Sequence, residues 1–305
     1  DPDRGDPPKE QTVFKVAYDD DALYFGFACY TQNGTAIRQN LSRRDNFVDS
    51  DLVAVFLDPY HDQTTGYAFV LNPLGVQQDR FIVSDVDGDF DMDWDTVWDG
   101  ETSRDDDGWY AEMRIPFSSI RYRPDAPHWG LLVSRYMHDL GEEDAWVTWD
   151  REVAGFVSRF GHLEGLRDIP APRQLELVPY TVTRVTDPSV TGTEEFDNHQ
   201  NLGLDLKYGV TSALTLNATF QPDFGQVEAD PATLNLSPHE TFFEEKRPFF
   251  IEGRGFFQHP DFNLFYSRRI GTGDETSPIR YAGKLTGKTQ DKFSLGALVA
   301  STDLT

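Results

Sequence analysis

The chain has 305 residues, with 27 basic and 52 acidic side chains, and a formal net charge of −25 at pH 7. Proteins bind a phosphate backbone through a basic face, so this charge argues against a nucleic-acid partner. The sequence contains no run of 18 apolar residues, and we therefore expect no transmembrane helix. The single cysteine, Cys29, lies in an apolar segment and excludes a disulfide within the chain.

Charge and aromatic composition divide the chain into two parts. Residues 1–169 carry 34 acidic and 15 basic side chains and all six tryptophans, whereas residues 170–305 carry 18 acidic and 12 basic side chains. A Pro-rich joint, Ile169-Pro170-Ala171-Pro172, lies between them. The sequence therefore predicts two domains, 1–169 and 170–305.

The first part consists of short alternating segments separated by Gly, Pro and Asp clusters, which favour turns. The predicted strands cover residues 13–18, 22–30, 51–57, 66–72, 78–84, 109–115 and 129–136. Short strands at this spacing, with few amphipathic helical windows, indicate an all-β domain. We predict an antiparallel β-sandwich of jelly-roll type.

The second part alternates over longer segments. Residues 201–209 and 212–221 predict one hairpin, residues 279–288 and 292–301 predict another, and residues 174–185 add a further strand. Such strands are typical of outer-membrane barrels but also of soluble antiparallel sheets, and the pattern leaves both open. The Phe-rich residues 222–270 are too many and too aromatic for an ordinary loop, so we expect them to pack against another part of the protein, such as a barrel lumen.

An unusually acidic run lies near the middle of the first part. Asp85, Asp87, Asp89 and Asp91 alternate around Gly88. Oxygen ligands at this density suit Ca²⁺, although the spacing is not that of an EF-hand. The sequence therefore predicts a calcium site at these four aspartates, with a solvated acidic loop as the alternative.

Aromatic side chains are candidates for sugar stacking, because an aromatic ring packs against the apolar face of a pyranose. Trp98, Trp146 and Trp149 are the candidates, and core packing is the alternative for each. Signs of catalysis are weak: nothing pairs Glu112 with a second carboxylate, and no Gly-x-Ser-x-Gly elbow occurs. The seven histidines lack metal-type spacing, and we expect no haem.

Four segments of the first part carry a family resemblance: residues 13–25, 49–58, 109–117 and 160–163. In order and spacing they resemble the family 9 carbohydrate-binding modules, over most of residues 10–169. The resemblance implies a sandwich that clamps a glycan end between two Trp residues and binds structural calcium. The two clamp positions fall at Phe47 and near Phe156, and Arg135 is a further candidate ligand-binding residue.

Three segments after the joint carry a second resemblance: residues 220–230, 243–253 and 264–271. They resemble the outer-membrane barrel domain of unknown function that follows such modules in bacterial proteins. The resemblance implies antiparallel strands of a partial membrane β-barrel. About five strands cannot close a barrel, so we expect further strands from a longer chain or from elsewhere.

These observations predict a non-catalytic carbohydrate-binding-like module of a bacterial outer-membrane protein, engaged in glycan capture or uptake. We expect it in the bacterial cell envelope, with the module periplasmic or extracellular and with a glycan, the outer membrane and a further protein as partners. Two alternatives stay open. One is a structural or assembly subunit that docks another protein, and the other is an enzyme associated with glycoside hydrolysis.

Overall fold

The computed structural model divides into two compact units, Asp1–Pro172 (unit 1) and Arg173–Thr305 (unit 2). The structure describes residues 7–31, 35–46, 49–92, 94–123, 126–147, 154–167, 169, 175–186, 197–211, 214–222, 245, 247–251, 253–257, 265–270, 279–288 and 293–302.

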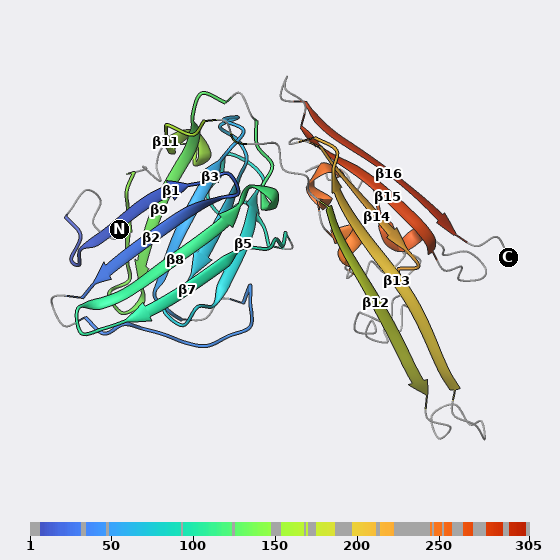
Figure 1. The fold of residues 1–305 in the computed structure, drawn as a ribbon, viewed down its shortest axis with the longest axis horizontal. Helices are drawn as coiled ribbons and strands as arrows, with labels where there is room; N and C mark the ends of the chain where they lie inside the picture. The colour runs from blue at the N-terminus through green and yellow to red at the C-terminus, as the bar shows by residue number, and fades with distance from the viewer. Residues whose placement is uncertain are drawn as a thin grey trace, which may run out of the picture. The chain divides into compact units, whose positions relative to one another are not determined.

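Unit 1 is a sandwich of two antiparallel sheets (Figure 1). The first sheet has the order β1-β2-β8-β7 and contains β1 (Thr12–Tyr18), β2 (Ala22–Tyr30), β7 (Asp99–Arg104) and β8 (Gly108–Pro116). The second has the order β10-β9-β3-β4-β5-β6, with β11 also paired to β9, and contains β3 (Leu52–Asp58), β4 (Gly66–Leu71), β5 (Gln77–Ile82), β6 (Phe90–Asp91), β9 (Trp129–Met137), β10 (Glu142–Ala145) and β11 (Gly161–Leu163). Three short 3₁₀ helices lie in the connections between these strands: η1 (Phe117–Ser119), η2 (His138–Leu140) and η3 (Val157–Arg159).

The hydrophobic core of unit 1 lies between the two sheets. Alternate residues of β3, namely Val53, Val55 and Leu57, are fully buried there, together with Phe25 and Trp109 of the first sheet. Because successive side chains of a strand point to opposite faces, this alternation sets the register of each strand. Burying one such side chain stabilises the fold by ~1.5–3 kcal/mol.

The predicted strands of unit 1 are confirmed, and four further strands were not predicted. Two of them, β6 and β11, contain only two and three residues. The other two are β7 and β10. Their sequences, Asp-Gly-Glu-Thr-Ser-Arg and Glu-Glu-Asp-Ala, are polar and show no apolar alternation. Both strands lie at the edge of a sheet. Charged edge strands resist pairing with other molecules, so these positions give no hydrophobic signal.

Unit 2 contains a five-stranded antiparallel sheet in sequential order (Figure 1). Its strands are β12 (Leu175–Thr186), β13 (Asp197–Gly209), β14 (Leu214–Phe220), β15 (Ile279–Lys288) and β16 (Ser294–Thr302). Both predicted hairpins, β13–β14 and β15–β16, are confirmed. The end strands β12 and β16 each pair with one neighbour among the described residues, so the described sheet is open.

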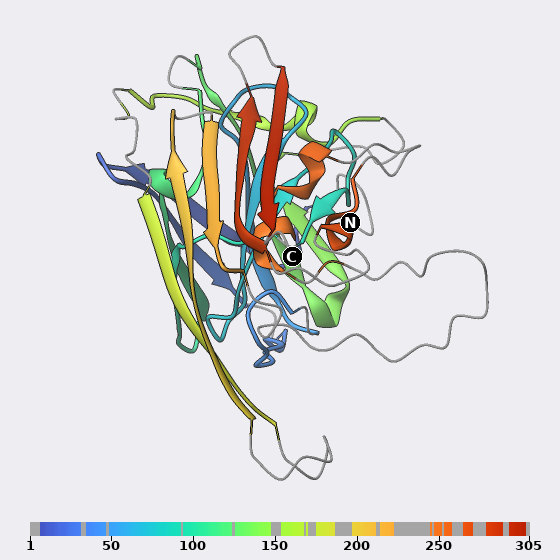
Figure 2. The ribbon, with the colours of Figure 1, turned by 90° about the vertical axis from the view of Figure 1, so that its right-hand side faces the viewer.

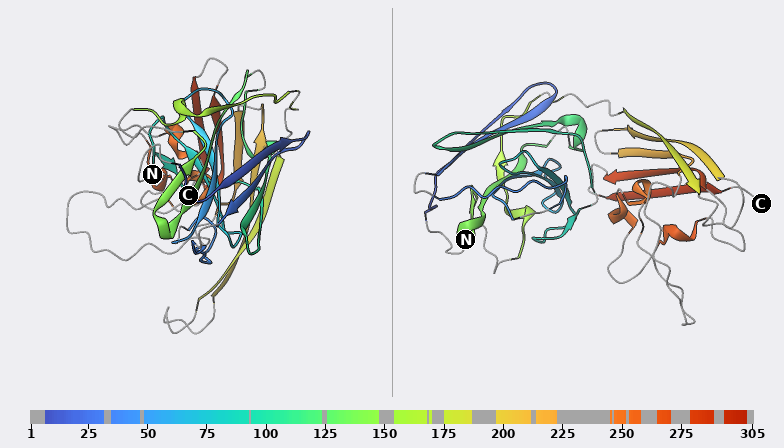
Figure 3. Two further views of the ribbon diagram at one scale, coloured as in Figure 1. Left: turned by 90° about the vertical axis from the view of Figure 1, so that its left-hand side faces the viewer. Right: turned by 90° about the horizontal axis from the view of Figure 1, so that it is seen from below.

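Short helices lie on one face of this sheet (Figures 2 and 3). They are α2 (Pro248–Ile251), η5 (Arg254–Phe257) and η6 (Ser267–Arg269). Phe249 and Phe250 pack against Ile279 and Ala282, and the Lys284 ammonium donates to the Phe249 carbonyl at 2.6 Å. The described part of the Phe-rich segment therefore packs against the sheet. None of the described helices is long and apolar enough to cross a membrane.

The two faces of the unit 2 sheet have unusual polarity. The face under the helices buries Thr215, Asn217, Thr219, Lys284 and Thr286. The cross-strand pairs of the opposite face join uncharged residues: Leu177 with Leu206, Leu204 with Phe220, Tyr208 with Leu216, Phe220 with Tyr281, Leu216 with Leu285, and Leu285 with Ala297. The sheet thus buries its polar side and exposes its apolar side.

Candidate functional site

One face of the second sheet of unit 1 points away from the core between the sheets. The strand register places every second residue of each strand there, as in the pairs Ala54–Ser134 and Val70–Gln78. We call this the outer face; its side chains are Leu52, Ala54, Phe56, Ala68, Val70, Gln78, Arg80, Ile82, Leu132, Ser134, Tyr136 and Glu143.

Residues 154–160, the cover segment, lie over the apolar half of the outer face. The Phe156 ring packs edge-on against Phe56 and Phe160, with ring centroids 5.6 and 5.1 Å apart. Asp85 fixes this segment, because its carboxylate accepts the Phe156 and Ser158 N–H groups at 2.8 and 2.9 Å and the Ser158 hydroxyl at 2.7 Å. Burial opposes ionisation of Asp85, but these hydrogen bonds outweigh it and lower its pKa.

The other half of the outer face is polar. Gln78, Arg80, Ser134, Tyr136 and Glu143 share it. A shallow hollow lies at one end, lined by Ser42, Asn46, Ser50, Asn72, Gln77 and Gln78, over Leu52, Val70 and Val76. Amides and hydroxyls around an apolar floor can hydrogen-bond sugar hydroxyls while the floor contacts the C–H face.

Arg80 lies where the polar and apolar halves meet. Its guanidinium donates to the Gln78 side-chain oxygen at 2.5 Å and lies 5.0 Å from the centre of the Phe90 ring. Burial lowers the pKa of Arg80 to about 10, so the side chain stays charged at neutral pH. A fixed guanidinium of this kind is a strong hydrogen-bond donor at the edge of the polar half.

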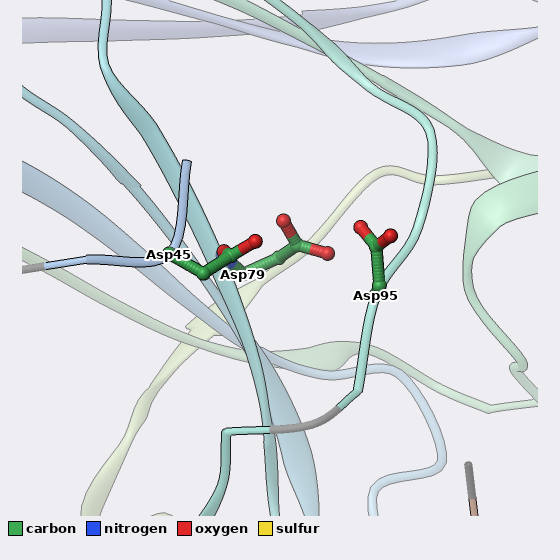
Figure 4. Close-up of side chains that lie close together, drawn as sticks. All are labelled: Asp45, Asp79 and Asp95. Carbon is green, nitrogen blue, oxygen red and sulfur yellow. The ribbon is translucent and has the colours of Figure 1, made fainter. Parts of the chain in front are cut away.

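Three carboxylates converge beside β5: Asp45, Asp79 and Asp95 (Figure 4). One oxygen from each lies within 4.8 Å of the others. The Arg44 guanidinium contacts all three, at 3.5 Å from Asp45, 2.5 Å from Asp79 and 3.3 Å from Asp95. Burial raises the pKa of Asp79 to about 6, and Arg44 opposes this rise. Arg44 already supplies positive charge here, so the cluster ties the loops on either side to β5.

Two predicted ligand-binding residues lie inside unit 1. Trp98 is 3 % exposed, and its indole N–H donates to Asp79 at 3.3 Å. Arg135 is 1 % exposed, and its Nη1 donates to the Gln11 and Tyr30 carbonyls and the Thr12 hydroxyl. Neither side chain belongs to the outer face.

The other predicted ligand-binding residues have different surroundings. Phe156 is 2 % exposed within the cover segment, whereas Trp146 is 50 % exposed beside the Phe14 ring. Gly161 lets Trp146 lie flat on the backbone, since a Cβ there would come within 2.6 Å of the indole. Phe47 and Trp149 lie outside the described residues.

The predicted calcium ligands occupy the loop before and at β6. Asp85 is used by the cover segment, and Ser84 donates a hydrogen bond to Asp89. Within the described residues, the converging group of three carboxylates is Asp45, Asp79 and Asp95, to which Asp85, Asp87, Asp89 and Asp91 do not belong. Calcium binding by this loop stays a prediction.

Sequence reasoning missed the polar half of the outer face. Gln78 and Arg80 alternate in the predicted strand 78–84, and this alternation was the available signal. Ser134 and Tyr136 lie at alternate positions of a predicted strand in the same way. The hollow itself depends on Ser42, Asn46 and Ser50 lying beside the strands, which the local sequence does not specify.

The fold of unit 1 defines a two-sheet antiparallel sandwich module whose second sheet has a partly polar outer face. Residues 5–162 match the family described as carbohydrate family 9 binding domain-like. The chain therefore belongs to this family, and the predicted resemblance is confirmed. Residues 171–303 match a domain of unknown function, DUF5916.

Two solved structures of a family 9 carbohydrate binding module from Caldicellulosiruptor kristjanssonii are similar to unit 1. The complex with cellotriose is 18 % identical and covers 54 % of this chain and 80 % of its own, with a TM-score of 0.38. The complex with glucose is 19 % identical and covers 55 % and 84 %, with a TM-score of 0.38. A comparison with curated protein sequences finds no match.

Proposed function

We propose that unit 1 binds a glycan on the polar half of its outer face, without catalysing its cleavage. We further propose that unit 2 supplies strands of an outer-membrane β-barrel in a bacterial cell envelope. The module then captures glycans at that membrane, on its periplasmic or extracellular side, for retention or uptake. Membership of the carbohydrate family 9 binding domain-like family carries the glycan part of this proposal.

The chemistry of the outer face supports a neutral sugar ligand. Tyr136 and Ser134 on β9 and Gln78 on β5 offer hydroxyl and amide groups on either side of β3 and β4, and Arg80 on β5 adds a charged donor. Ala54 and Val70 leave a low apolar floor between them. Ser134 and Gln78 are each 5 % exposed, whereas Tyr136 and Arg80 are half-buried, so a sugar would contact this face chiefly through Tyr136 and Arg80.

A glycan array with the full chain tests this assignment, followed by calorimetric titration of the best ligand. Tyr136→Phe removes one hydroxyl from the polar half and is expected to weaken binding roughly 5- to 10-fold, as loss of a hydrogen bond of about 1 kcal/mol would. Tyr110→Phe is the matched control, because its hydroxyl contacts Asp105 on the first sheet. This control should bind like the wild type.

Two outcomes would contradict the glycan proposal. One is an array without any bound glycan. The other is a loss of binding in Trp146→Ala with unchanged affinity in Tyr136→Phe, which would place the ligand at the sandwich edge beside Phe14.

The polarity of the unit 2 sheet supports the membrane part of the proposal. Lys284 is 2 % exposed on the inner face, whereas Leu202 and Val299 are 70 and 67 % exposed on the other. A sheet with one face in water shows the reverse arrangement. Apolar residues outside and polar residues inside are the pattern of membrane-barrel strands.

Flotation with phospholipid vesicles tests the membrane assignment of unit 2. The full chain is expected to float with the vesicles, and Leu204→Lys to float less, because a charge on the lipid-facing side costs up to about 2–4 kcal/mol. Leu41→Lys makes the same change at a leucine of unit 1 that is 79 % exposed, and should float like the wild type. Equal flotation of both variants would contradict a lipid-facing sheet.

A further inference from the structure

Three histidines from distant parts of the sequence lie against one another at one end of unit 1. His61 follows β3, His128 precedes β9 and His162 lies in β11. The ring of His128 is 4.2 Å from that of His61 and 3.8 Å from that of His162, measured between centroids, and the outer two rings are 6.1 Å apart. Sequence spacing did not reveal this group, which forms only through strand pairing.

The second sheet brings the three segments together at Gly130. This residue of β9 pairs with Asp58 at the end of β3 and with His162 of β11. A Cβ on Gly130 would lie 2.9 Å from the Asp58 Cβ, so glycine permits the close approach of the strands. His128, two residues earlier, thereby comes between the other two imidazoles.

The turn that carries His61 is held independently of the other two histidines. The Asp58 carboxylate accepts the N–H groups of Asp62 and Gln63 at 3.2 and 2.9 Å. Asp62 in turn accepts those of Thr64 and Thr65 at 2.8 and 2.7 Å. His61 itself adopts a left-handed backbone conformation with φ of 51°. The turn therefore presents His61 in one fixed position, and such preorganisation favours ligand binding.

The central imidazole has a polar atom without a partner. His128 Nε2 is inaccessible to solvent and has no hydrogen bond among the described residues. Buried polar atoms nearly always have a hydrogen-bond partner, so each exception calls for an explanation. A nitrogen that becomes a metal ligand on binding would account for it.

We propose that His61, His128 and His162 bind one divalent transition-metal ion of the Zn²⁺ and Cu²⁺ class. Neutral imidazole is the commonest protein ligand for these ions, whereas Ca²⁺ prefers oxygen. Metal–nitrogen bonds of about 2.0–2.1 Å require bound nitrogens to lie within roughly 4 Å of one another. The ring centroids lie 3.8, 4.2 and 6.1 Å apart, so the nitrogens reach one ion only after the rings turn.

Binding requires the rings to leave the stack and turn their nitrogens toward one point. Rotation about χ2 does this, and that torsion is broad in histidine. His162 is exposed, so its side chain is free to turn and water can complete the coordination. The acidic surface of unit 1, with 34 acidic and 15 basic side chains up to residue 169, favours the approach of a cation.

Copper and zinc titrations of the untagged full chain test the proposal. With one equivalent of Cu²⁺, electron paramagnetic resonance should show coupling to two or three imidazole nitrogens. Competition against a chromophoric chelator should give one tight Zn²⁺ site per chain. His162→Ala should remove one imidazole coupling and weaken Zn²⁺ binding more than about 10-fold, since loss of even an outer-shell partner costs that much.

His138→Ala is the matched control, because His138 lies elsewhere in unit 1 beside Asp49 and Asp139. It should bind both metals like the wild type. His128→Gln, checked for folding by circular dichroism, provides a second variant at the centre of the group. Copper signals without imidazole coupling, or equal Zn²⁺ affinity in the wild type and His162→Ala, would overturn the proposal.

Discussion

Arg135 ties the second sheet of unit 1 to the ends of the first. Its Nη1 donates to the Tyr30 carbonyl at 3.0 Å, the Thr12 hydroxyl at 3.2 Å and the Gln11 carbonyl at 3.3 Å. A buried charge with several acceptors is costly to disturb, because removing it leaves those acceptors unsatisfied. Arg135 therefore has a structural role in this sandwich, between the sheets and away from the outer face.

Arg135→Lys should test that role. Lysine cannot reproduce the planar fork of the guanidinium, so we expect the free energy of unfolding of unit 1 to fall by roughly 1–3 kcal/mol. Urea unfolding followed by Trp fluorescence measures the change, and glycan affinity of the folded variant should stay unchanged. Wild-type stability combined with lost glycan affinity would restore Arg135 as a ligand-binding residue.

Asp58 should make unit 1 less stable as the pH rises. Burial and the neighbouring Asp62 raise its pKa to about 6 from 3.8, so the folded state keeps a proton that the unfolded chain has released. The stabilisation is complete below pH 3.8 and is lost as the pH rises through 6. Asp58→Asn should remove the contribution of Asp58 to the change of unfolding free energy with pH. For one proton, this contribution is at most about 1.4 kcal/mol per pH unit.

Urea unfolding of both proteins at several values between pH 4.5 and 7.5 gives the comparison. Other groups titrate in wild type and variant alike. The contribution of Asp58 is therefore the difference between the two proteins in how steeply the unfolding free energy changes with pH. Identical slopes would show that Asp58 ionises in the folded state as it does in the unfolded chain.

The cover segment is the element that divides the outer face into an apolar and a polar half. Its Phe156 lies near the position expected for one side of a glycan clamp, yet it packs into the aromatic cluster with Phe56 and Phe160. Its anchor, Asp85, belongs to the run predicted to bind calcium. Asp85 of the acidic loop thus holds the cover segment in place.

Asp85→Ala should loosen the cover segment, whereas Asp87→Ala should not. The first change removes three hydrogen bonds and is expected to cost about 1–3 kcal/mol of unfolding free energy at neutral pH. The second is the matched control in the same loop. Thermal unfolding with 1 mM CaCl₂ and with EDTA distinguishes anchoring of the cover segment from calcium binding. If Asp85 binds calcium, the loss of stability in Asp85→Ala should differ between the two conditions. Equal stability of both variants would contradict an anchoring role.

Sequence alternation predicted most strands of both units because each buries one face. It failed for β7 and β10, whose polar sequences at the sheet edges show no apolar alternation. The site was harder to predict: Trp98 and Trp146 are both Trp, but one is 3 % and the other 50 % exposed. Which tryptophan side chain is accessible depends on loops and on distant glycines such as Gly161. These contacts cannot be predicted from the residues next to each tryptophan.

The two units have opposite distributions of polarity. Unit 1 buries apolar residues such as Val55 and Phe69 between its sheets. The unit 2 sheet buries Asn217 and Lys284 instead and leaves Tyr281 and Leu295 exposed. Apolar surface in water is unfavourable by about 25 cal/mol per Å². An amphiphile that covers the exposed face should therefore stabilise unit 2 and leave unit 1 unchanged.

Calorimetry of the full chain at increasing concentrations of a non-ionic detergent tests this expectation. We expect two unfolding transitions, because the units form separate compact bodies. Detergent above its critical micelle concentration should raise the midpoint of the unit 2 transition. It covers the apolar face of the folded sheet, and a ligand that prefers the folded state stabilises that state. Phe156→Leu assigns the other transition, because it removes packing from unit 1 alone. A detergent response of the transition that Phe156→Leu lowers, or a single transition for the whole chain, would contradict a lipid-facing sheet carried by an independent sandwich module.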